Sequence, residues 1–179
     1  ATPDTVKKFL SFGCDVSVER GAGTTSGYLD QAYADQGAQL IDPGDAAGWS
    51  QADIFLCVQP PSAASLARLR QGALVVGLLS PYANEELTAS LKRGALSAMA
   101  LELLPRISRA QSADALSSQA NIAGYKSVLL ASAALDRYFP MLMTAAGTVQ
   151  PAKVVILGAG VAGLQLSLIH ISEPTRPFH

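Results

Sequence analysis

Three glycines near the end of the chain have the spacing of a loop that binds the phosphates of a nucleotide. Gly158, Gly160 and Gly163 directly follow the apolar run Lys153 to Leu157 in a Gly-x-Gly-x-x-Gly pattern. In such a pattern the first glycine permits a sharp turn, the second lets backbone N–H groups approach a pyrophosphate, and the third lets a helix pack closely on its strand. The anion lies at the helix N-terminus, where unpaired N–H groups favour negative charge. The pattern therefore predicts a strand, a turn and a helix that bind a dinucleotide.

A second glycine-rich stretch, Gly21, Gly23 and Gly27, also follows an expected strand and precedes an expected helix. The strand before it, Asp15 to Glu19, alternates polar and apolar residues, which indicates that one of its faces contacts water. We interpret this stretch as a turn whose glycines adopt positive φ, with a nucleotide loop as the alternative.

The chain offers few groups for acid–base or metal chemistry. Its only two histidines, His170 and His179, lie in the last ten residues, and Cys14 and Cys57 stand in unrelated patterns without metal-ligand spacing. We expect both cysteines to be small buried residues. Thirteen lysines and arginines against 14 aspartates and glutamates leave no basic excess that would indicate a nucleic-acid surface. We therefore predict no metal ion, no nucleic acid and no residue that acts as a general acid or base.

The elements that must position these groups alternate along the chain. Strands are expected at Asp15 to Glu19, Gln39 to Ile41, Asp53 to Val58, Ala73 to Leu79 and Ala95 to Leu104. Helices are expected between Thr2 and Gly13, Leu29 and Gln36, Ser62 and Arg70, and Asn84 and Gly94. The continuous apolar runs at 53–58 and 73–79 indicate strands covered on both faces. This alternation predicts an α/β fold with a doubly wound, Rossmann-like parallel sheet.

The pattern changes after Pro105. Arg106 to Ser112 is polar and aperiodic, which indicates a loop, and Asp114 begins a helix expected to run to about Tyr138. Apolar residues recur on one face of this helix, at Ile122, Tyr125, Leu129 and Ala133. We interpret it as a helix that bridges two domains.

The segment after this helix is expected to lead into the second domain. Pro140 breaks the helical pattern, Met141 to Thr144 is expected to start another helix, and Gly147 to Pro151 leads into a new strand. We place a first domain at residues 1–118, and the bridging helix with the first strand and turn of a second Rossmann NAD-binding domain at 119–165.

Three stretches of the chain carry a resemblance to a known family. They are PRISRAQSADALSSQANIAGYKSVLLA (Pro105–Ala131), RYFPMLMTAAGTVQPAKVVILGAGVAGLQ (Arg137–Gln165) and VERGAG (Val18–Gly23). Together they resemble the NAD(H)-binding component at the start of the alpha subunit of proton-translocating NAD(P) transhydrogenase, in the alanine dehydrogenase/transhydrogenase family. The resemblance covers residues 1–165 and implies two Rossmann-like domains with an NAD(H) cleft between them.

The resemblance also implies an activity and partners. Members of the family transfer hydride between NADH and NADP+ and couple this transfer to proton movement across a membrane. The component works as a homodimer, beside a transmembrane proton-conducting component and a separate component that binds NADP(H). We therefore expect a peripheral protein on the cytoplasmic face of a bacterial inner membrane, without a transmembrane segment in this chain.

The resemblance assigns a role to the polar loop after Pro105. In the family this loop lies against the nicotinamide, and the matching positions hydrogen-bond its carboxamide and neighbouring groups. Those positions are Arg106, Gln111, Asp114 and Ser117. Ala113 stands where methionine is common, a small departure beside the loop. From the residues alone, Arg106 and Asp114 are equally compatible with a surface ion pair and a helix cap.

The lack of a general base separates two activities within the family. Oxidising an amine or alcohol requires a proton acceptor, whereas direct hydride transfer between two nicotinamides requires orientation and close approach. Alanine dehydrogenases carry a substrate-binding lysine where this chain has Gln59, and a catalytic histidine in the segment that matches Gly77 to Ala83. The alternatives to a transhydrogenase are an alanine dehydrogenase-like enzyme and a non-catalytic NAD-binding or dimerisation module.

The C-terminal residues do not resemble the family. LSLIHISEPTR (Leu166–Arg176) resembles the translation of a sequencing-library adapter, so we expect residues 166–179 to be an artefact and its histidines to have no role. We expect native residues before Ala1 and after Gln165, including the residue that reads the NAD ribose. The chain is expected to be an inactive fragment, because Val154 to Leu157 would lack neighbours to bury them.

Overall fold

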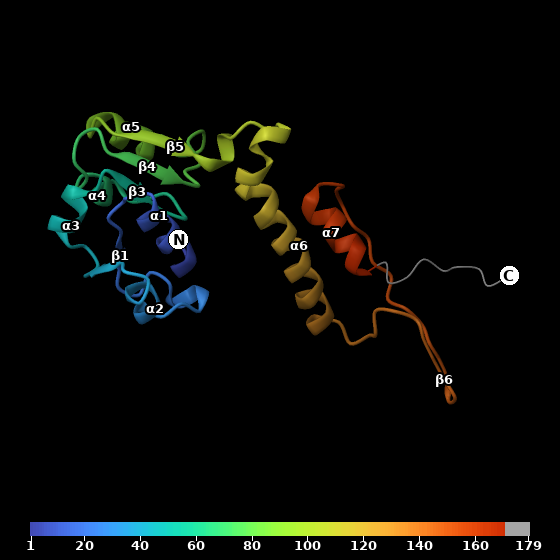
Figure 1. Ribbon diagram of the computed structural model, residues 1–179. Coiled ribbons are helices and arrows are strands. Elements are labelled where there is room, and N and C mark those ends of the chain that lie inside the picture. Colours follow the sequence, from blue (N-terminus) through green and yellow to red (C-terminus); the bar gives the residue numbers. More distant parts are fainter. Residues whose placement is uncertain (171–179) are drawn as a thin grey trace. The chain divides into compact units, whose positions relative to one another are not determined.

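The computed structural model describes residues 1–170, and the chain divides into two compact units (Figure 1). The first unit is Ala1–Leu103, and the second begins at Leu104. Ser118, where we place the end of the first domain from the sequence, lies in the first turn of a long helix, and that boundary stays a prediction. Residues 171–179, with most of the adapter-like segment and His179, lie outside the described residues.

The first unit begins with the helix that the sequence predicts, α1 (Pro3–Ser11). Thr2 caps it: the Thr2 hydroxyl accepts a hydrogen bond from the Thr5 N–H at 3.3 Å. Val6 is fully buried against a small core that includes Tyr33, and Gly13 follows the helix at φ +79°. Because a capping residue and a glycine stop are local signals, both ends of this helix were predictable.

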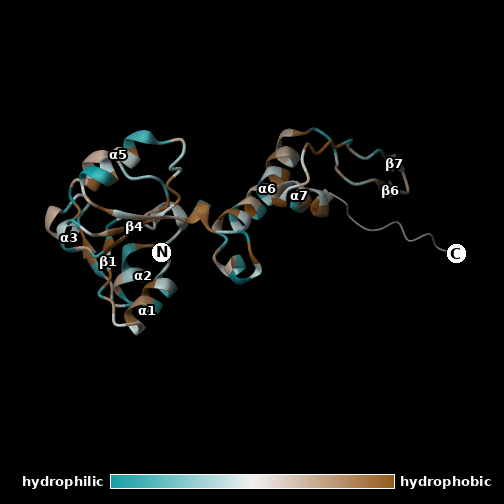
Figure 2. Cartoon of the chain, turned by 90° about the horizontal axis from the view of Figure 1, so that it is seen from above, coloured by the Kyte–Doolittle hydropathy of each residue, from teal (hydrophilic) through white to brown (hydrophobic). Residues whose placement is uncertain are grey.

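Parallel strands joined by helices make up the rest of the first unit, which confirms the α/β class. One sheet pairs β1 (Ser17–Glu19) with β2 (Gln39–Ile41), and the connection holds η1 (Thr24–Ser26) and α2 (Asp30–Ala34). The other has the order β3-β4-β5, with β3 (Ile54–Leu56), β4 (Leu74–Gly77), β5 (Ser97–Ala100), and the crossover helices α4 (Ala63–Leu66) and α5 (Glu85–Arg93). Figure 2 shows hydrophilic residues on α5.

The larger core lies beside the three-stranded sheet. Its innermost residues are Leu66, Val75 and Leu79, none more than 1% exposed, and each such burial contributes about 1.5–3 kcal/mol. The expectation that residues 53–58 form a strand covered on both faces was wrong. β3 is an edge strand, and only the face that carries Phe55 packs against the core. Ile54, on the opposite face, is 56% exposed.

Three further features of this unit differ from the expectations drawn from the sequence. The pattern did not predict α3 (Ala46–Gln51), which Asp45 caps and which carries the buried Trp49. The strand expected at 95–104 ends at Ala100 and continues as a 3-10 turn, η2 (Leu101–Leu103). Cys14 is exposed just after α1, so the expectation that it is buried was wrong, whereas partial burial raises the pKa of the Cys57 thiol.

The second unit is built around two packed helices, α6 (Ala115–Ala134) and α7 (Val161–His170). α6 ends four residues before Tyr138, earlier than expected. The stretch Met141 to Thr144 is not helical: β6 (Leu142–Thr144) and β7 (Gly147–Val149) form an antiparallel hairpin. The Thr144 hydroxyl closes its turn by accepting the Ala146 N–H at 3.2 Å, a side-chain bond that competes with helix formation.

The strand expected at Lys153 to Leu157 is absent from the described chain. The segment carries no strand assignment, and Val155 is 83% and Leu157 95% exposed. A strand needs a neighbour with which to exchange ladder hydrogen bonds, and no segment of residues 1–170 pairs with this one. Within the same residues, no helix has both the length and the apolar character needed to cross a membrane.

Candidate functional site

The glycine turn before α7 has the local geometry of a phosphate-binding loop. Gly158 lies at φ +119°, a conformation that favours glycine. A Cβ on Gly163 would overlap the Gly158 carbonyl oxygen, so only glycine lets the helix begin this close to the turn. A Cβ on Gly160, in contrast, would meet nothing within 4 Å, which leaves room for a ligand to approach the backbone. The turn at Gly158 and the close packing at Gly163 agree with the steric roles that the spacing predicts, and the binding of a pyrophosphate at Gly160 stays a prediction.

A fourth glycine, Gly124 of α6, holds this turn from the other side. It is buried, and a Cβ there would overlap the Ala162 carbonyl in the first turn of α7. Asn121 of α6 also donates a hydrogen bond from Nδ2 to Gln165 Oε1 at 3.0 Å. Sequence reasoning missed Gly124, although a glycine inside a strong helical pattern indicates a close packing contact.

The polar loop after Pro105 contains a short 3-10 helix, η3 (Ser108–Ala113), where the sequence indicates irregular structure. An open hollow of about 260 Å³ lies on this segment and is lined by Pro105, Arg106, Ile107, Ser108, Ala110, Gln111 and Asp114. Three of the four nicotinamide-loop residues named from the sequence, Arg106, Gln111 and Asp114, thus border one hollow. Ile107, Ser108 and Ala110 were not singled out from the sequence. They line the hollow because they lie between Arg106 and Gln111, in and just before η3.

Asp114 and Ser117 are joined at the start of α6. The Asp114 carboxylate accepts hydrogen bonds from the Ser117 backbone N–H at 2.9 Å and from the Ser117 hydroxyl at 2.6 Å. These bonds, with a smaller effect of the Arg106 charge, hold the pKa of Asp114 below its ordinary value. The expected helix cap is confirmed. No ion pair with Arg106 is found within residues 1–170, where the Arg106 side chain is exposed to solvent.

This cap predicts a pH-dependent contribution to stability. Because the pKa of Asp114 is lowered in the folded protein, the stabilisation is present above the ordinary pKa of 3.8 and is lost as pH falls through the lower, folded-state value. We expect Asp114→Asn to have a lower melting temperature than the wild type at pH 7, and the difference to shrink at pH 3. Thermal melts of the two proteins at both pH values check this. A difference that widens in acid would contradict it.

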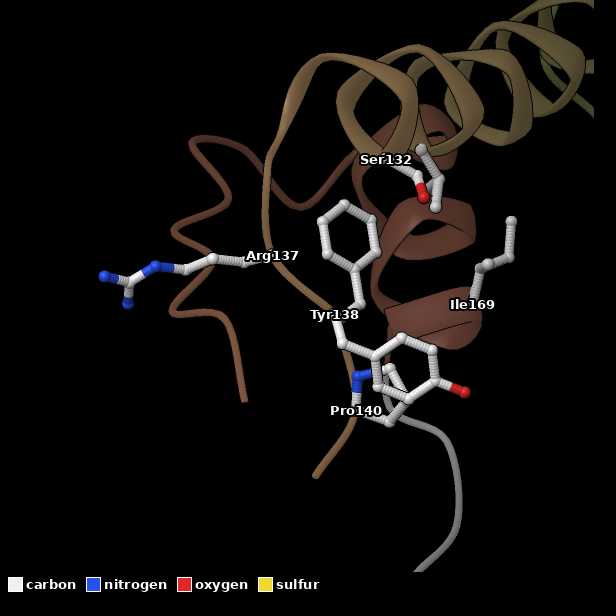
Figure 3. A pocket seen from close by; sticks show the side chains of 7 residues that line it. Ser132, Arg137, Tyr138, Pro140 and Ile169 are labelled. Carbon is white, nitrogen blue, oxygen red and sulfur yellow. The ribbon is translucent and has the colours of Figure 1, made fainter. Parts of the chain in front are cut away.

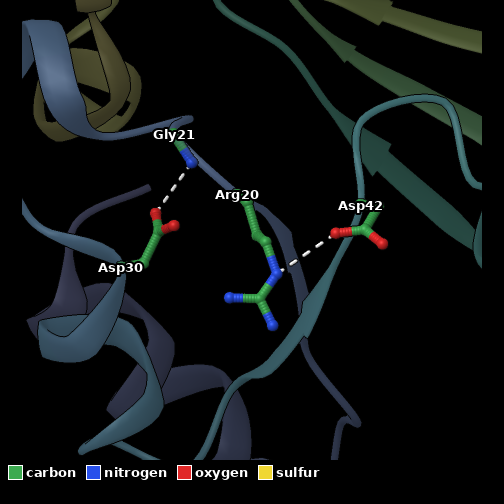
Figure 4. A network of polar contacts seen from close by, with 4 residues as sticks. All are labelled: Arg20, Gly21, Asp30 and Asp42. Atoms are coloured by element: carbon green, nitrogen blue, oxygen red, sulfur yellow. Dashed lines mark hydrogen bonds and ion pairs between the residues drawn. The ribbon is translucent and has the colours of Figure 1, made fainter.

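The first glycine stretch is a turn whose Gly21 backbone N–H already has a hydrogen-bond partner within the protein (Figure 4). The Gly21 N–H donates to the Asp30 carboxylate at 2.7 Å, so a negative side chain lies where an anionic ligand would bind. Arg20 pairs with Asp42 at 3.2 Å, between Nε and Oδ1. Gly21 and Gly27 have φ near +80°. The interpretation as a glycine-rich turn is confirmed, although Gly23 lies at φ −96° and does not share the expected positive φ.

A second hollow, of about 280 Å³, lies beside the C-terminal end of α6 (Figure 3). Its lining includes Ser132, Arg137, Tyr138 and Pro140, and it is completed by Ile169 of α7. Ile169 lies in the segment whose sequence resembles an adapter. One wall of this hollow therefore comes from the segment that we expect from the sequence to be an artefact, and we assign the hollow no function.

Parallel strands with helical crossovers, followed by a glycine turn at a helix N-terminus, define a protein of the Rossmann-like nucleotide-binding class. Sequence comparison names the family within this class. The chain belongs to the alanine dehydrogenase/PNT family: the model of its N-terminal domain matches residues 1–123 and that of its C-terminal domain matches residues 127–169.

Individual relatives agree with this assignment. The chain is 44% identical over 163 residues to NAD(P) transhydrogenase subunit alpha of Cereibacter sphaeroides, covering 91% of this chain and 31% of that protein. It is 31% identical over 175 residues to alanine dehydrogenase of Mycobacterium tuberculosis, covering 94% and 45%. The crystal structure of transhydrogenase from Sinorhizobium meliloti superposes with a TM-score of 0.88 at 44% identity, over 99% of this chain and 55% of that one. The chain thus spans between 31% and 55% of the length of these three proteins.

Proposed function

We propose that residues 1–165 are the N-terminal portion of the NAD(H)-binding component of a proton-translocating NAD(P) transhydrogenase. The observation that carries the proposal is the higher identity to the named transhydrogenase subunit, 44% against 31% for the named alanine dehydrogenase. Gln59 and the histidine-free segment Gly77 to Ala83 support the same choice, because they replace the lysine and histidine of the alanine dehydrogenases.

The residues of the second unit fit a dinucleotide. The backbone at Gly160 is open to a ligand, and the N–H groups at the start of α7 offer donors for a pyrophosphate. Arg106 and Gln111, both exposed on the rim of their hollow, supply donors for a carboxamide, and Asp114 with Ser117 fixes the start of α6 below them. When bound, the nicotinamide would supply the hydride. Arg106 and Gln111 would hold and orient the nicotinamide ring. No proton acceptor is required at the reacting atoms.

The partners of the proposed component follow from the same family. NADP(H) binds to a separate component, a transmembrane component conducts protons, and two copies of the present component form a homodimer on the cytoplasmic face of the inner membrane. The name of the Cereibacter sphaeroides relative, subunit alpha, supports an enzyme that is assembled from more than one subunit.

The proposed function is tested on the intact protein, the uninterrupted product of the gene that encodes residues 1–165. Mixed with an NADP(H)-binding component of the family, it should transfer hydride between NADH and an NADP+ analogue, followed by absorbance. Supplied with NAD and L-alanine instead, it should produce no NADH. Production at the rate of a true dehydrogenase would favour the alanine dehydrogenase-like alternative, which the Mycobacterium tuberculosis match supports.

The chain of 179 residues is expected to bind NADH only weakly by itself. The exposure of Val155 and Leu157 supports this expectation, because these apolar residues beside the glycine turn are not packed against other residues. A fluorescence titration of NADH with this chain should give a dissociation constant above about 1 mM. Binding in the micromolar range would instead support a self-sufficient, non-catalytic NAD-binding module.

A further inference from the structure

Glu102 links two segments of the first unit that are far apart in sequence. It lies in η2, directly after β5, and its Oε1 accepts a hydrogen bond from the Leu79 N–H at 2.8 Å and another from the Ser80 N–H. Two backbone donors on one carboxylate oxygen are charge-assisted bonds, roughly twice as strong as neutral ones. The carboxylate thus joins the end of β5 to the end of β4.

The turn that Glu102 holds is in a conformation that serine rarely adopts. Ser80 lies at φ +48°, in the left-handed region, and the Ala83 N–H donates to the Ser80 carbonyl at 3.0 Å to close the turn. Such a backbone persists where surrounding contacts determine it, and the two bonds to Glu102 are those contacts. The turn lies at the carboxyl end of β4, the edge of a parallel sheet where ligands bind.

The second oxygen of Glu102 is buried without a compensating bond. Oε2 has no hydrogen-bond partner among residues 1–170. An unpaired buried oxygen lowers stability, so packing alone would favour an apolar residue at this position. A carboxylate at this position is instead explained by the pair of N–H groups that its other oxygen accepts.

The chain continues directly from this anchor into the candidate nicotinamide loop. Leu104 and Pro105 are the only residues between η2 and Arg106. Pro105 restricts φ, and the Ile107 N–H donates to the Pro105 carbonyl at 2.9 Å, so the chain turns tightly at the start of the loop. Glu102 therefore lies only four residues before Arg106 in the chain.

We propose that Glu102 is a positioning residue for hydride transfer: its carboxylate holds the turn 80–83 against η2, the last element before the loop that carries Arg106 and Gln111. The proposal rests on the proposed function. Glu102 lies next in sequence to the nicotinamide loop, whereas the glycine turn before α7 follows only after α6. Its loss should therefore lower kcat and leave the binding of NADH nearly unchanged.

Variants of the intact protein, assayed for transhydrogenation and melted thermally, test this latch. Glu102→Ala should lower kcat about tenfold or more, while KM for NADH changes less than about threefold. Glu102→Gln should stay within about threefold of the wild type, because the amide oxygen can still accept both N–H groups. Glu86→Ala, which removes an exposed glutamate of α5, is the matched control and should leave both parameters unchanged.

A double variant separates positioning from folding. In Glu102→Ala with Ser80→Gly, glycine adopts the left-handed conformation without help, so the melting temperature should recover while kcat stays about tenfold low, since η2 is still unlatched. The double variant also tests the positioning role if Glu102→Ala alone does not fold. A wild-type kcat in the double variant, or a loss in Glu102→Gln as large as in Glu102→Ala, would overturn the latch. An inactive wild type would overturn the proposed function, and the latch with it.

Discussion

Replacing Gly163 by valine should lower the affinity of the intact protein for NADH at least about a hundredfold, equivalent to about 2.7 kcal/mol. A Cβ at this position overlaps the Gly158 carbonyl oxygen, and backbone cannot yield as a flexible side chain can. The start of α7 would therefore move away from the turn and carry with it the N–H groups proposed to bind the pyrophosphate. Because the same overlap strains the fold, the melting temperature should fall as well.

Titration calorimetry with NADH, together with thermal melts, measures both effects. Gly163→Ala introduces the same Cβ with less bulk beyond it and should give a smaller loss of the same kind. Ala89→Val, on the exposed side of α5, adds bulk to a helix of the first unit and should leave the affinity unchanged. If Gly163→Val bound NADH as tightly as the wild type, the proposed role of the close packing at this turn would be wrong.

The regions of the fold that the sequence predicted are those with local causes. Thr2 and Asn84 cap helices through bonds to residues three positions later, and Gly13 follows a helix with positive φ, so each signal lies within a few residues of its effect. The regions that it missed depend on distant neighbours. Whether Ile54 is covered depends on its place in the sheet, and whether 153–157 becomes a strand depends on a pairing partner. Neither fact is encoded in the segment itself.

The candidate site divides in the same way. Gly158 and Gly163 are recognisable because each meets a local steric demand, and Asp114 is recognisable as a cap. Gly124 and Glu102 were missed, since each matters through a contact made across the fold, to Ala162 and to the turn at Ser80. The grouping of Arg106 and Gln111 came from the family resemblance, and the hollow that they share with Asp114 gives it a geometric basis.

Gly160→Val should weaken NADH binding about a hundredfold while the melting temperature of the ligand-free protein stays unchanged. Its Cβ meets nothing within 4 Å, and its φ lies outside the left-handed region, so the folded chain has room for the side chain. The same room is what the proposed pyrophosphate needs, and valine would fill it. Binding and stability should therefore separate at Gly160, whereas they fall together at Gly163.

The pair of variants tests the assignment of the turn more strictly than either alone. Calorimetric titration gives the affinity for NADH, and thermal melts without NADH give the stability. If Gly160→Val lowered the melting temperature as much as Gly163→Val, its weaker binding would reflect a damaged turn. If it bound NADH normally, the pyrophosphate would have to lie elsewhere. Only a loss of affinity in a fully stable protein places the ligand against the backbone at Gly160.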